Sequence, residues 1–253
     1  MNTRSQHIVS LCEEKLKATL QYHDDLNPKI WDGETLKPAV RNDLIKIATK
    51  WKEFAKLPPK STTDLILTGG NANFNYTAYS DLDVHWIMHR SDLGGNPDLI
   101  EDYIIDKKNL WAKEHCIKVY GYDVELYAQD VKTKFPAGQA VYSIMHNKWL
   151  SKPRKVAVNF DDPHLLMKVK HYMSRIDHMI MHNENDAAFE RLKDKFKNMR
   201  KSAISKGGEF GFENLVFKEL RNRGYLDKVN DFLHQRTDKR FSLFLRKKKN
   251  ATK

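Results

Sequence analysis

The sequence has little cysteine and no long run of apolar residues. Cys12 and Cys116 are the only cysteines in 253 residues, too few for a disulfide framework or a cysteine-rich zinc site. No stretch of 18 apolar residues is present, so we expect no transmembrane helix, and the N-terminus lacks the apolar core of a signal peptide. Internal repeats are also absent. These absences predict a cytoplasmic protein without a membrane partner.

The formal net charge is +11, and it is unevenly distributed. Residues 1–150 contain 19 Lys and Arg against 20 Asp and Glu, whereas residues 151–253 contain 25 against 13. A strongly basic half is typical of proteins that bind a polyanion, most often nucleic acid. The charge therefore predicts RNA or tRNA as a partner of residues 151–253. The alternative is a solvated basic surface that aids solubility.

Hydrophobic periodicity predicts a first half in which helices alternate with strands. Prolines mark the starts of two helices, and glycines mark turns between strands. The predicted elements are helices over 5–22 and 38–56, strands over 64–68 and 81–88, a helix from Pro97, and a strand pair over 116–128.

After Pro136-Ala137-Gly138 the pattern predicts helices alone. Asp162-Pro163 is a cap and first-turn pair that begins a long helix. Further helices are predicted over 187–205, 211–223 and 226–235. We therefore expect an α+β protein in three parts: an α+β domain with N-terminal helices over 1–145, a basic helical domain over 146–245, and a disordered basic tail over 246–253.

The segment LTGGNANFNYTAYSDLDVH, residues 67–85, joins a glycine pair, a polar loop and an Asp-x-Asp between two predicted strands. Because side chains alternate along a strand, Asp81 and Asp83 leave the same face, opposite to Leu82 and Val84. Two parallel carboxylates beside a glycine-rich turn suit Mg²⁺, which takes few protein ligands and is shared with nucleotide phosphates. The pattern therefore favours a metal and nucleotide site; the alternative is an ordinary polar strand face.

A third carboxylate follows on a later predicted strand. In the segment YDVELY, Val124 and Leu126 point toward a core and Glu125 toward the opposite face. If this strand lies beside residues 81–88, Glu125 faces the first two carboxylates. Three carboxylates then suit two Mg²⁺ ions roughly 3.5–4 Å apart, an arrangement for in-line displacement at phosphorus. We expect Asp81 and Asp83 to bridge both ions and Glu125 to complete the site of the ion that activates the attacking hydroxyl.

These residues resemble the motif of the polymerase-β-type nucleotidyltransferase superfamily. That motif is a Gly-Gly or Gly-Ser pair, about ten residues, an acidic-x-acidic strand and a third carboxylate on a later strand. Here it is Gly69-Gly70, ten intervening residues, Asp81-Leu82-Asp83 and Glu125. The full string, with WLSKP at 149–153 and KGGEFGFENLVFKELRNRGYL at 206–226, is similar to nucleotidyltransferase-domain proteins of tailed phages.

The resemblance implies a nucleotidyltransferase-type mixed sheet with flanking helices, followed by a helical domain. It implies Mg²⁺ or Mn²⁺ as cofactor, an NTP as substrate, and Asp81, Asp83 and Glu125 as catalytic metal ligands. It assigns triphosphate binding to Gly69, Gly70, Asn73, Ser80, Lys193 and Lys197. A phage origin would place the protein in the host cytoplasm.

The sequence departs from the family at two glycines. Gly70 replaces the serine that many members place in the pair, although backbone N–H groups can still bind phosphate. Gly211 stands near the position of a serine that related synthases place against the triphosphate. Lys193, Lys197 and Lys201 lie four apart on one helical face, so a solvated stripe or an RNA contact are alternatives to phosphate binding.

Aromatic residues in the motif's loop have two interpretations. Phe74, Tyr76 and Tyr79 either stack on a base or pack as a lid over the site.

Three functions are compatible with these patterns. The first is transfer of a nucleoside monophosphate from an NTP to a hydroxyl on RNA or tRNA. The second keeps the chemistry but uses a small molecule, a protein or a second nucleotide as acceptor, including cyclic or oligonucleotide synthesis. The third is a non-catalytic nucleic-acid-binding protein, although the presence of all three carboxylates argues against a decayed site. These motifs do not specify the base of the NTP, the acceptor or the oligomeric state.

Overall fold

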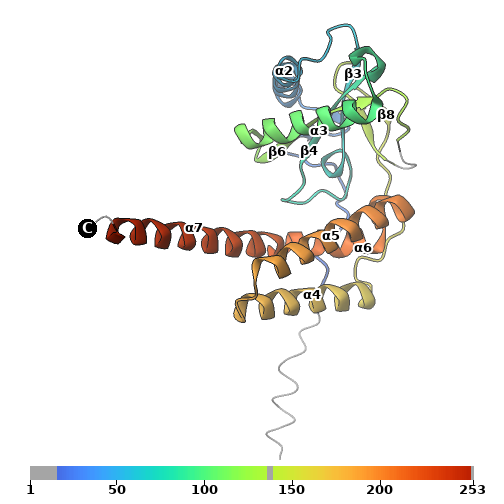
Figure 1. The fold of residues 1–253 in the computed structure, drawn as a ribbon. Helices are drawn as coiled ribbons and strands as arrows, with labels where there is room; N and C mark the ends of the chain where they lie inside the picture. Colours follow the sequence, from blue (N-terminus) through green and yellow to red (C-terminus); the bar gives the residue numbers. More distant parts are fainter. Residues whose placement is uncertain (1–15, 136–138, 252–253) are drawn as a thin grey trace, which may run out of the picture. The chain divides into compact units, whose positions relative to one another are not determined.

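The computed structural model describes residues 16–135 and 139–251, without the side chains of 243–251 (Figure 1). The chain divides into two compact units. One is Gln21–Ala157, and the described part of the other is residues 16–20 and 158–251.

The unit Gln21–Ala157 is built on a six-stranded mixed sheet with the order β5-β6-β4-β3-β7-β8. Strand β4 pairs in parallel with β6, and the other neighbouring strands are antiparallel. A parallel pair needs a crossover connection, and helix α3 lies in the connection from β4 to β6. The strands are β3 Thr62–Thr68, β4 Leu82–Met88, β5 Lys118–Val119, β6 Tyr122–Asp130, β7 Val141–Ser143 and β8 Lys148–Ser151.

The helices of this unit begin where the sequence predicts. Helix α2, Pro38–Phe54, has a proline in its first turn, and so has α3, Pro97–Glu114. The side chain of Asn96 caps α3 by accepting from the N–H of Asp98 at 2.8 Å. The remaining elements are the strand pair β1 Trp31–Asp32 and β2 Thr35–Leu36 and the short helices η1 Gly70–Ala72 and η2 Arg90–Leu93.

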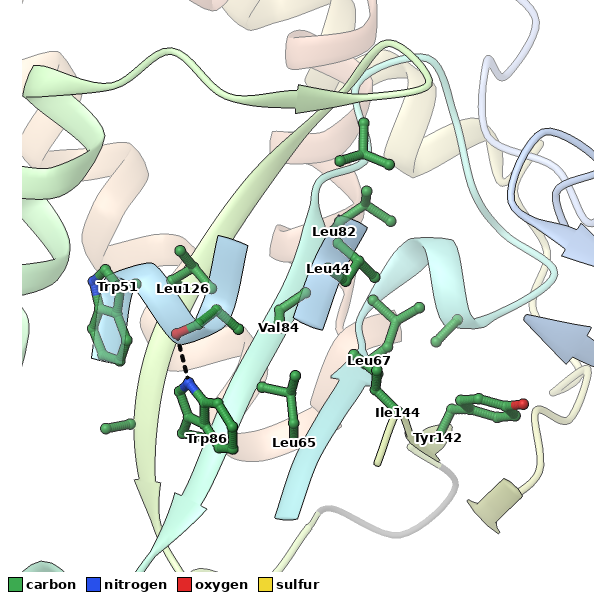
Figure 2. Close-up of a cluster of buried hydrophobic side chains, with 14 of the residues drawn as sticks. Leu44, Trp51, Leu65, Leu67, Leu82, Val84, Trp86, Leu126, Tyr142 and Ile144 are labelled. Carbon is green, nitrogen blue, oxygen red and sulfur yellow. Dashed lines mark hydrogen bonds between the residues drawn. The ribbon is translucent and has the colours of Figure 1, made fainter. Parts of the chain in front are cut away.

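The core of this unit lies between the sheet and α2 (Figure 2). Leu82, Val84 and Trp86 of β4 are buried and alternate with half-buried residues, as the sequence predicts. The indole N–H of Trp86 donates to the carbonyl of Ala48 in α2 at 2.9 Å, which ties the sheet to the helix. Because this face of β4 is committed to the core, Asp83 leaves the opposite face.

The second unit is helical. Its elements are α4 Pro163–Met181, α5 Asp186–Gly207, η3 Gly208–Phe210, α6 Phe212–Asn222 and α7 Tyr225–Ala251. Asp162 caps α4 by accepting from the N–H groups of His164 at 2.7 Å and Leu165 at 3.4 Å, as the Asp-Pro pair predicts. One apolar face from each helix meets in a core that includes Val169, Ile176, Phe189, Val216, Leu220 and Val229. The α+β class with a helical C-terminal region is confirmed.

The prediction of a helix over 5–22 is wrong for residues 16–22, the part of this range that the structure describes. Residues 1–15 lie outside the described residues, and 16–22 are not helical. The N–H groups of Thr19 and Leu20 donate instead to the carboxylate of Glu219, at 2.7 and 2.9 Å. Glu219 is fully buried and also pairs with Arg223. These two N–H groups are therefore bonded to a buried carboxylate and not to the backbone carbonyls of a helix.

The observed units also differ from the predicted domain limits. Strand β8 pairs with β7, so the sheet unit continues to Ala157 rather than ending at 145. Helix α7 continues to Ala251, through most of the tail 246–253 that composition predicted to be disordered. Within the described part of the chain, no helix combines the length and apolar composition needed to cross a bilayer.

Replacement of Glu219 by alanine should destabilise the helical unit by about 3 kcal/mol or more, because it removes a fully buried carboxylate that pairs with the half-buried Arg223 and accepts from two backbone N–H groups. Chemical unfolding followed by circular dichroism measures this loss. Glu219→Gln, which keeps one carbonyl acceptor, should lie between alanine and the wild type.

The matched control is Glu190→Ala, which removes only the exposed Glu190–Lys193 pair and should change stability by less than about 1 kcal/mol. Equal losses in Glu219→Ala and Glu190→Ala would contradict the structural role of Glu219.

Candidate active site

The parallel pairing of β4 with β6 brings two of the predicted carboxylates onto neighbouring strands. Asp83 and Glu125 are direct partners in this register, and neighbouring strands lie roughly 4.8 Å apart. Asp81 immediately precedes β4 and is half-buried, whereas Leu82 after it is fully buried. The alternation therefore continues through Asp81, which puts the three carboxylates on the sheet face opposite to α2.

Gly69 is fitted against the carboxylate of Asp83. Its φ of 78° and ψ of −161° lie in a region that is essentially reserved for glycine. A Cβ atom at Gly69 would lie 1.7 Å from Oδ2 and 2.7 Å from Cγ of Asp83. The carboxylate thus occupies the space that any side chain at position 69 would need. The glycine backbone and Asp83 form one closely packed corner of the site.

The second glycine of the pair makes room for Ser80. A Cβ atom at Gly70 would lie 2.9 Å from the hydroxyl oxygen of Ser80, which accepts from the N–H of Thr77 at 2.9 Å. A serine at position 70 would collide with this hydroxyl. The departure from the family motif therefore has a physical reason: Ser80 brings a hydroxyl to the space beside Gly70.

Asn73 closes the turn after the glycine pair. Its N–H donates to the carbonyl of Gly70 at 3.1 Å, and its buried side-chain oxygen accepts from the N–H of Phe74 at 2.8 Å. Gly69, Gly70 and Asn73 therefore belong to one turn that follows β3, and Ser80, at the far end of the loop, lies beside Gly70. Binding of a phosphate by these residues stays a prediction.

The side chain of Asn71 holds the two ends of the loop together. This role was not predicted from the sequence. The fully buried amide of Asn71 donates to the carbonyls of Ser80 at 3.2 Å and Asp81 at 3.0 Å. Its side-chain oxygen accepts from the amide of Asn27 at 2.8 Å, and its carbonyl accepts from the indole N–H of Trp31 at 2.7 Å. The start of β4 is thereby held against the turn. An asparagine in a polar loop carries no sequence signal of such a role.

The loop aromatics have different surroundings. The ring of Tyr76 stacks on His23 with centroids 3.9 Å apart, and Lys155 lies 5.3 Å from the ring of Phe74. Tyr79 is 40% exposed. Of the three, Tyr79 is therefore the one available to stack on a bound base, while Phe74 and Tyr76 hold the loop.

Glu125 is paired with a lysine that the sequence did not indicate. The ammonium of Lys108, on α3, lies 2.5 Å from Oε1 of Glu125 and 5.8 Å from the ring centre of Tyr127. Both members of the ion pair are partly exposed. Lys108 lies far from the Asp-x-Asp in sequence, and only the crossover of α3 beside β6 brings it there.

His85 shares the strand face of Asp83. Burial lowers the pKa of its imidazole, an effect opposed by a hydrogen bond to Gln129 and by the charge of Glu125. The imidazole Nδ1 donates to the side-chain oxygen of Gln129 at 2.9 Å. A neutral, buried imidazole adds no positive charge beside the carboxylates at neutral pH.

A hydrogen-bonded group connects η2, α3 and β6. Arg90 donates to the hydroxyl of Tyr127 at 2.7 Å and forms an ion pair with Glu101, and Tyr127 donates to Glu101 at 2.6 Å. Burial raises the pKa of Tyr127, and its bond to Glu101 raises it further. The group fixes α3 along β6 and so positions Lys108 beside Glu125.

The donor set fits a hard divalent cation, with one condition. Mg²⁺ is commonly held by one or two carboxylates together with substrate phosphates, which suits Asp81 and Asp83 beside the glycine turn. Among residues 16–135 and 139–251, no three His, Cys, Asp or Glu side chains are already gathered as a metal cluster. Glu125 pairs with Lys108 through Oε1, so at such a site this carboxylate would be shared with the ammonium or released from it.

Lys193 and Lys197 lie on α5, in the helical unit, whereas the three carboxylates lie in the unit Gln21–Ala157. Lys193 is exposed and pairs with Glu190 at 3.3 Å. Both lysines line a cavity of that unit, described below. Their binding to a triphosphate stays a prediction. Gly211 at the start of α6 packs closely on α5, since a Cβ there would lie 2.6 Å from the carbonyl of Ala203.

Comparisons with known proteins give one distant likeness. No protein-family model and no curated protein matches the chain. Among solved structures, a STING-associated CdnE c-di-GMP synthase from Capnocytophaga granulosa is 14% identical, over 79% of this chain and 68% of that chain, with a TM-score of 0.22. That TM-score is too low for the likeness to support a shared function. The similarity to phage proteins stays a prediction.

Replacement of Gly69 by alanine should displace Asp83 and weaken Mg²⁺-dependent NTP binding at least about tenfold, because the new methyl group needs the space of the carboxylate. Isothermal titration with a non-hydrolysable NTP measures the affinity.

Gly94→Ala is the matched control. Gly94 has a similar backbone conformation, φ 65° and ψ 156°, but nothing lies within 4 Å of an added Cβ. Both variants bear a backbone strain of about 1–3 kcal/mol, and only Gly69→Ala should lose nucleotide. Equal nucleotide affinity in the two variants would contradict the importance of the Gly69–Asp83 contact.

Proposed function

We propose that this protein is a Mg²⁺-dependent nucleotidyltransferase of the polymerase-β type, which moves a nucleoside monophosphate from an NTP to an acceptor hydroxyl. The observation that carries the proposal is the corner formed by Gly69 and Asp83, with Glu125 as the direct strand partner of Asp83. The backbone N–H groups of a glycine turn suit a triphosphate. The carboxylates beside this turn suit a divalent cation that is shared with the phosphates.

The turn after β3 binds and orients the triphosphate. Backbone N–H groups around Gly69 and Gly70 and the hydroxyl of Ser80 are the donors that face phosphate oxygens. Asn73 and Asn71 shape this turn through their internal hydrogen bonds, so the donors are positioned before the substrate arrives. Positioning of this kind is a main part of catalysis in phosphoryl transfer.

Asp81 and Asp83 would hold the metal, and Glu125 would complete the site on the side of the acceptor. When bound, Mg²⁺ neutralises triphosphate charge and lowers the pKa of the attacking hydroxyl. In the transfer, the acceptor hydroxyl loses its proton to solvent water and its oxygen forms a bond to the α-phosphorus. The bond from the α-phosphorus to the oxygen that bridges to the β-phosphate breaks, and pyrophosphate leaves. Lys108 then serves as the partner of Glu125 when the acceptor side is empty.

We propose RNA, including a tRNA end, as the acceptor. The support is the charge of residues 151–253, which contain 25 Lys and Arg against 13 Asp and Glu. A polyanion bound to such a surface is held by charge, so its affinity should fall steeply with salt.

The test is incubation of the purified protein with each α-³²P-labelled NTP, Mg²⁺ or Mn²⁺, and total RNA. Wild-type protein should transfer label, and Asp81→Asn and Asp83→Asn should each reduce the rate roughly 100-fold or more, because each variant removes an anionic ligand of the cation that would stabilise negative charge in the transition state. Asparagine keeps the size of aspartate, so the turn should remain folded.

Asp123→Asn is the control, because Asp123 is an exposed carboxylate on the same strand as Glu125 and pairs with Lys118. It should transfer label at the wild-type rate. Label in RNA supports RNA as the acceptor, whereas label only in a nucleotide product identifies a second nucleotide as the acceptor. No transfer by wild-type protein, or equal rates in all variants, would overturn the proposed function.

A further inference from the structure

The helical unit contains a cavity that the proposed function does not use. It has a volume of about 480 Å³ and lies between α5, α6 and α7 (orange to red in Figure 1). This volume is within the range of about 300–1,000 Å³ typical of ligand pockets. Apolar side chains form most of its wall: Leu192, Phe196, Ile204, Phe217, Leu226 and Val229.

One side of the cavity is cationic. Lys193, Lys197, Arg200 and Lys201 line it from α5, and no Asp or Glu of the described residues is among its lining. The guanidinium of Arg200 lies 5.1 Å from the ring centre of Phe217, which places its charge at the apolar wall. Lys197 and Lys201 are exposed, one helical turn apart. The cavity therefore combines an apolar wall with a positively charged edge.

The cavity is also elongated. Leu192 and Ile204, both on α5, are twelve residues apart, which corresponds to about 18 Å along a helix. An extended apolar chain matches this shape better than a compact ring system does.

We propose that this cavity binds a single-chain amphiphilic anion of the fatty-acid type, with a carboxylate or phosphate head. The apolar chain would lie against Phe196, Ile204 and Phe217, where its burial removes apolar surface from water. The head group would lie at Lys197 and Lys201. The inference rests on the helical unit alone and is independent of the proposed nucleotidyl transfer.

A nucleobase fits the cavity less well than an acyl chain. Its ring nitrogens and exocyclic groups would be buried against apolar side chains, which is unfavourable without hydrogen bonds. Asn230 supplies the one uncharged polar side chain of the described lining. An acyl chain has no polar groups to satisfy.

The test is calorimetric titration of the full chain with three probes: laurate below its critical micelle concentration, the neutral dodecanol of the same chain length below its solubility limit, and the short anion butyrate. Laurate should bind with a 1:1 stoichiometry and at least about tenfold more tightly than either of the others, since it alone has both the chain and the charge. Absence of saturable laurate binding, or equal affinity for dodecanol, would overturn the proposal.

Two variants locate the site. Lys197→Glu/Lys201→Glu reverses the charge at the edge, and Ile204→Trp fills the cavity from a side chain that is 42% exposed, so the core need not move. Each should weaken laurate binding at least about tenfold while thermal unfolding confirms the fold. Lys170→Glu/Lys206→Glu makes the same charge change at exposed residues outside the cavity and should bind laurate as the wild type does.

If both double variants weakened laurate binding equally, laurate would be held by the general positive charge of the protein and not in the cavity, which would contradict the proposal. A short single-stranded RNA that binds the wild type but not Ile204→Trp, without any laurate binding, would assign the cavity to a nucleobase instead.

Discussion

The carboxylate of Asp83 lies in the space that a side chain at Gly69 would occupy, and the rest of the site depends on this contact. The contact leaves no room for a side chain at Gly69, whose positive φ of 78° begins the turn that Gly70 and Asn73 continue. Asn71 then ties the turn to the residues before β4. The glycine turn and the carboxylate of Asp83, to which the proposed function assigns the triphosphate and the cation, are thus held together by direct packing and hydrogen bonds.

The core decides which way the carboxylates point. Leu82, Val84 and Trp86 are buried toward α2, and a shift of the register by one residue would bury Asp83 in their place. The parallel pairing with β6 fixes Glu125 opposite Asp83, and the crossover helix α3 brings Lys108 to Glu125. The same topology that supplies the third carboxylate therefore also supplies its counter-ion, and under the proposed function a cation at Glu125 would share this carboxylate with Lys108 or displace it.

Local patterns in the sequence were enough to predict α2, α3, β3 and β4, because prolines, glycines and period-two alternation determine them locally. The same alternation predicts that the side chains of Asp81 and Asp83 lie on one face of the strand. Contacts between distant residues were not predictable: Asn27 with Asn71, Lys108 with Glu125, and Glu219 with the segment at 19–20. Each joins polar residues whose local sequence is ordinary, and the last overrides helical periodicity at residues 16–22.

The central claim is that Asp83 and the turn at Gly69 bind a nucleotide and a divalent cation together. The most direct measurement is the affinity of wild-type protein and Asp83→Asn for α,β-methylene NTPs, each with and without Mg²⁺ or Mn²⁺. The account predicts binding that requires the cation and is lost in Asp83→Asn. Binding that is independent of the cation and equal in the variant would contradict it.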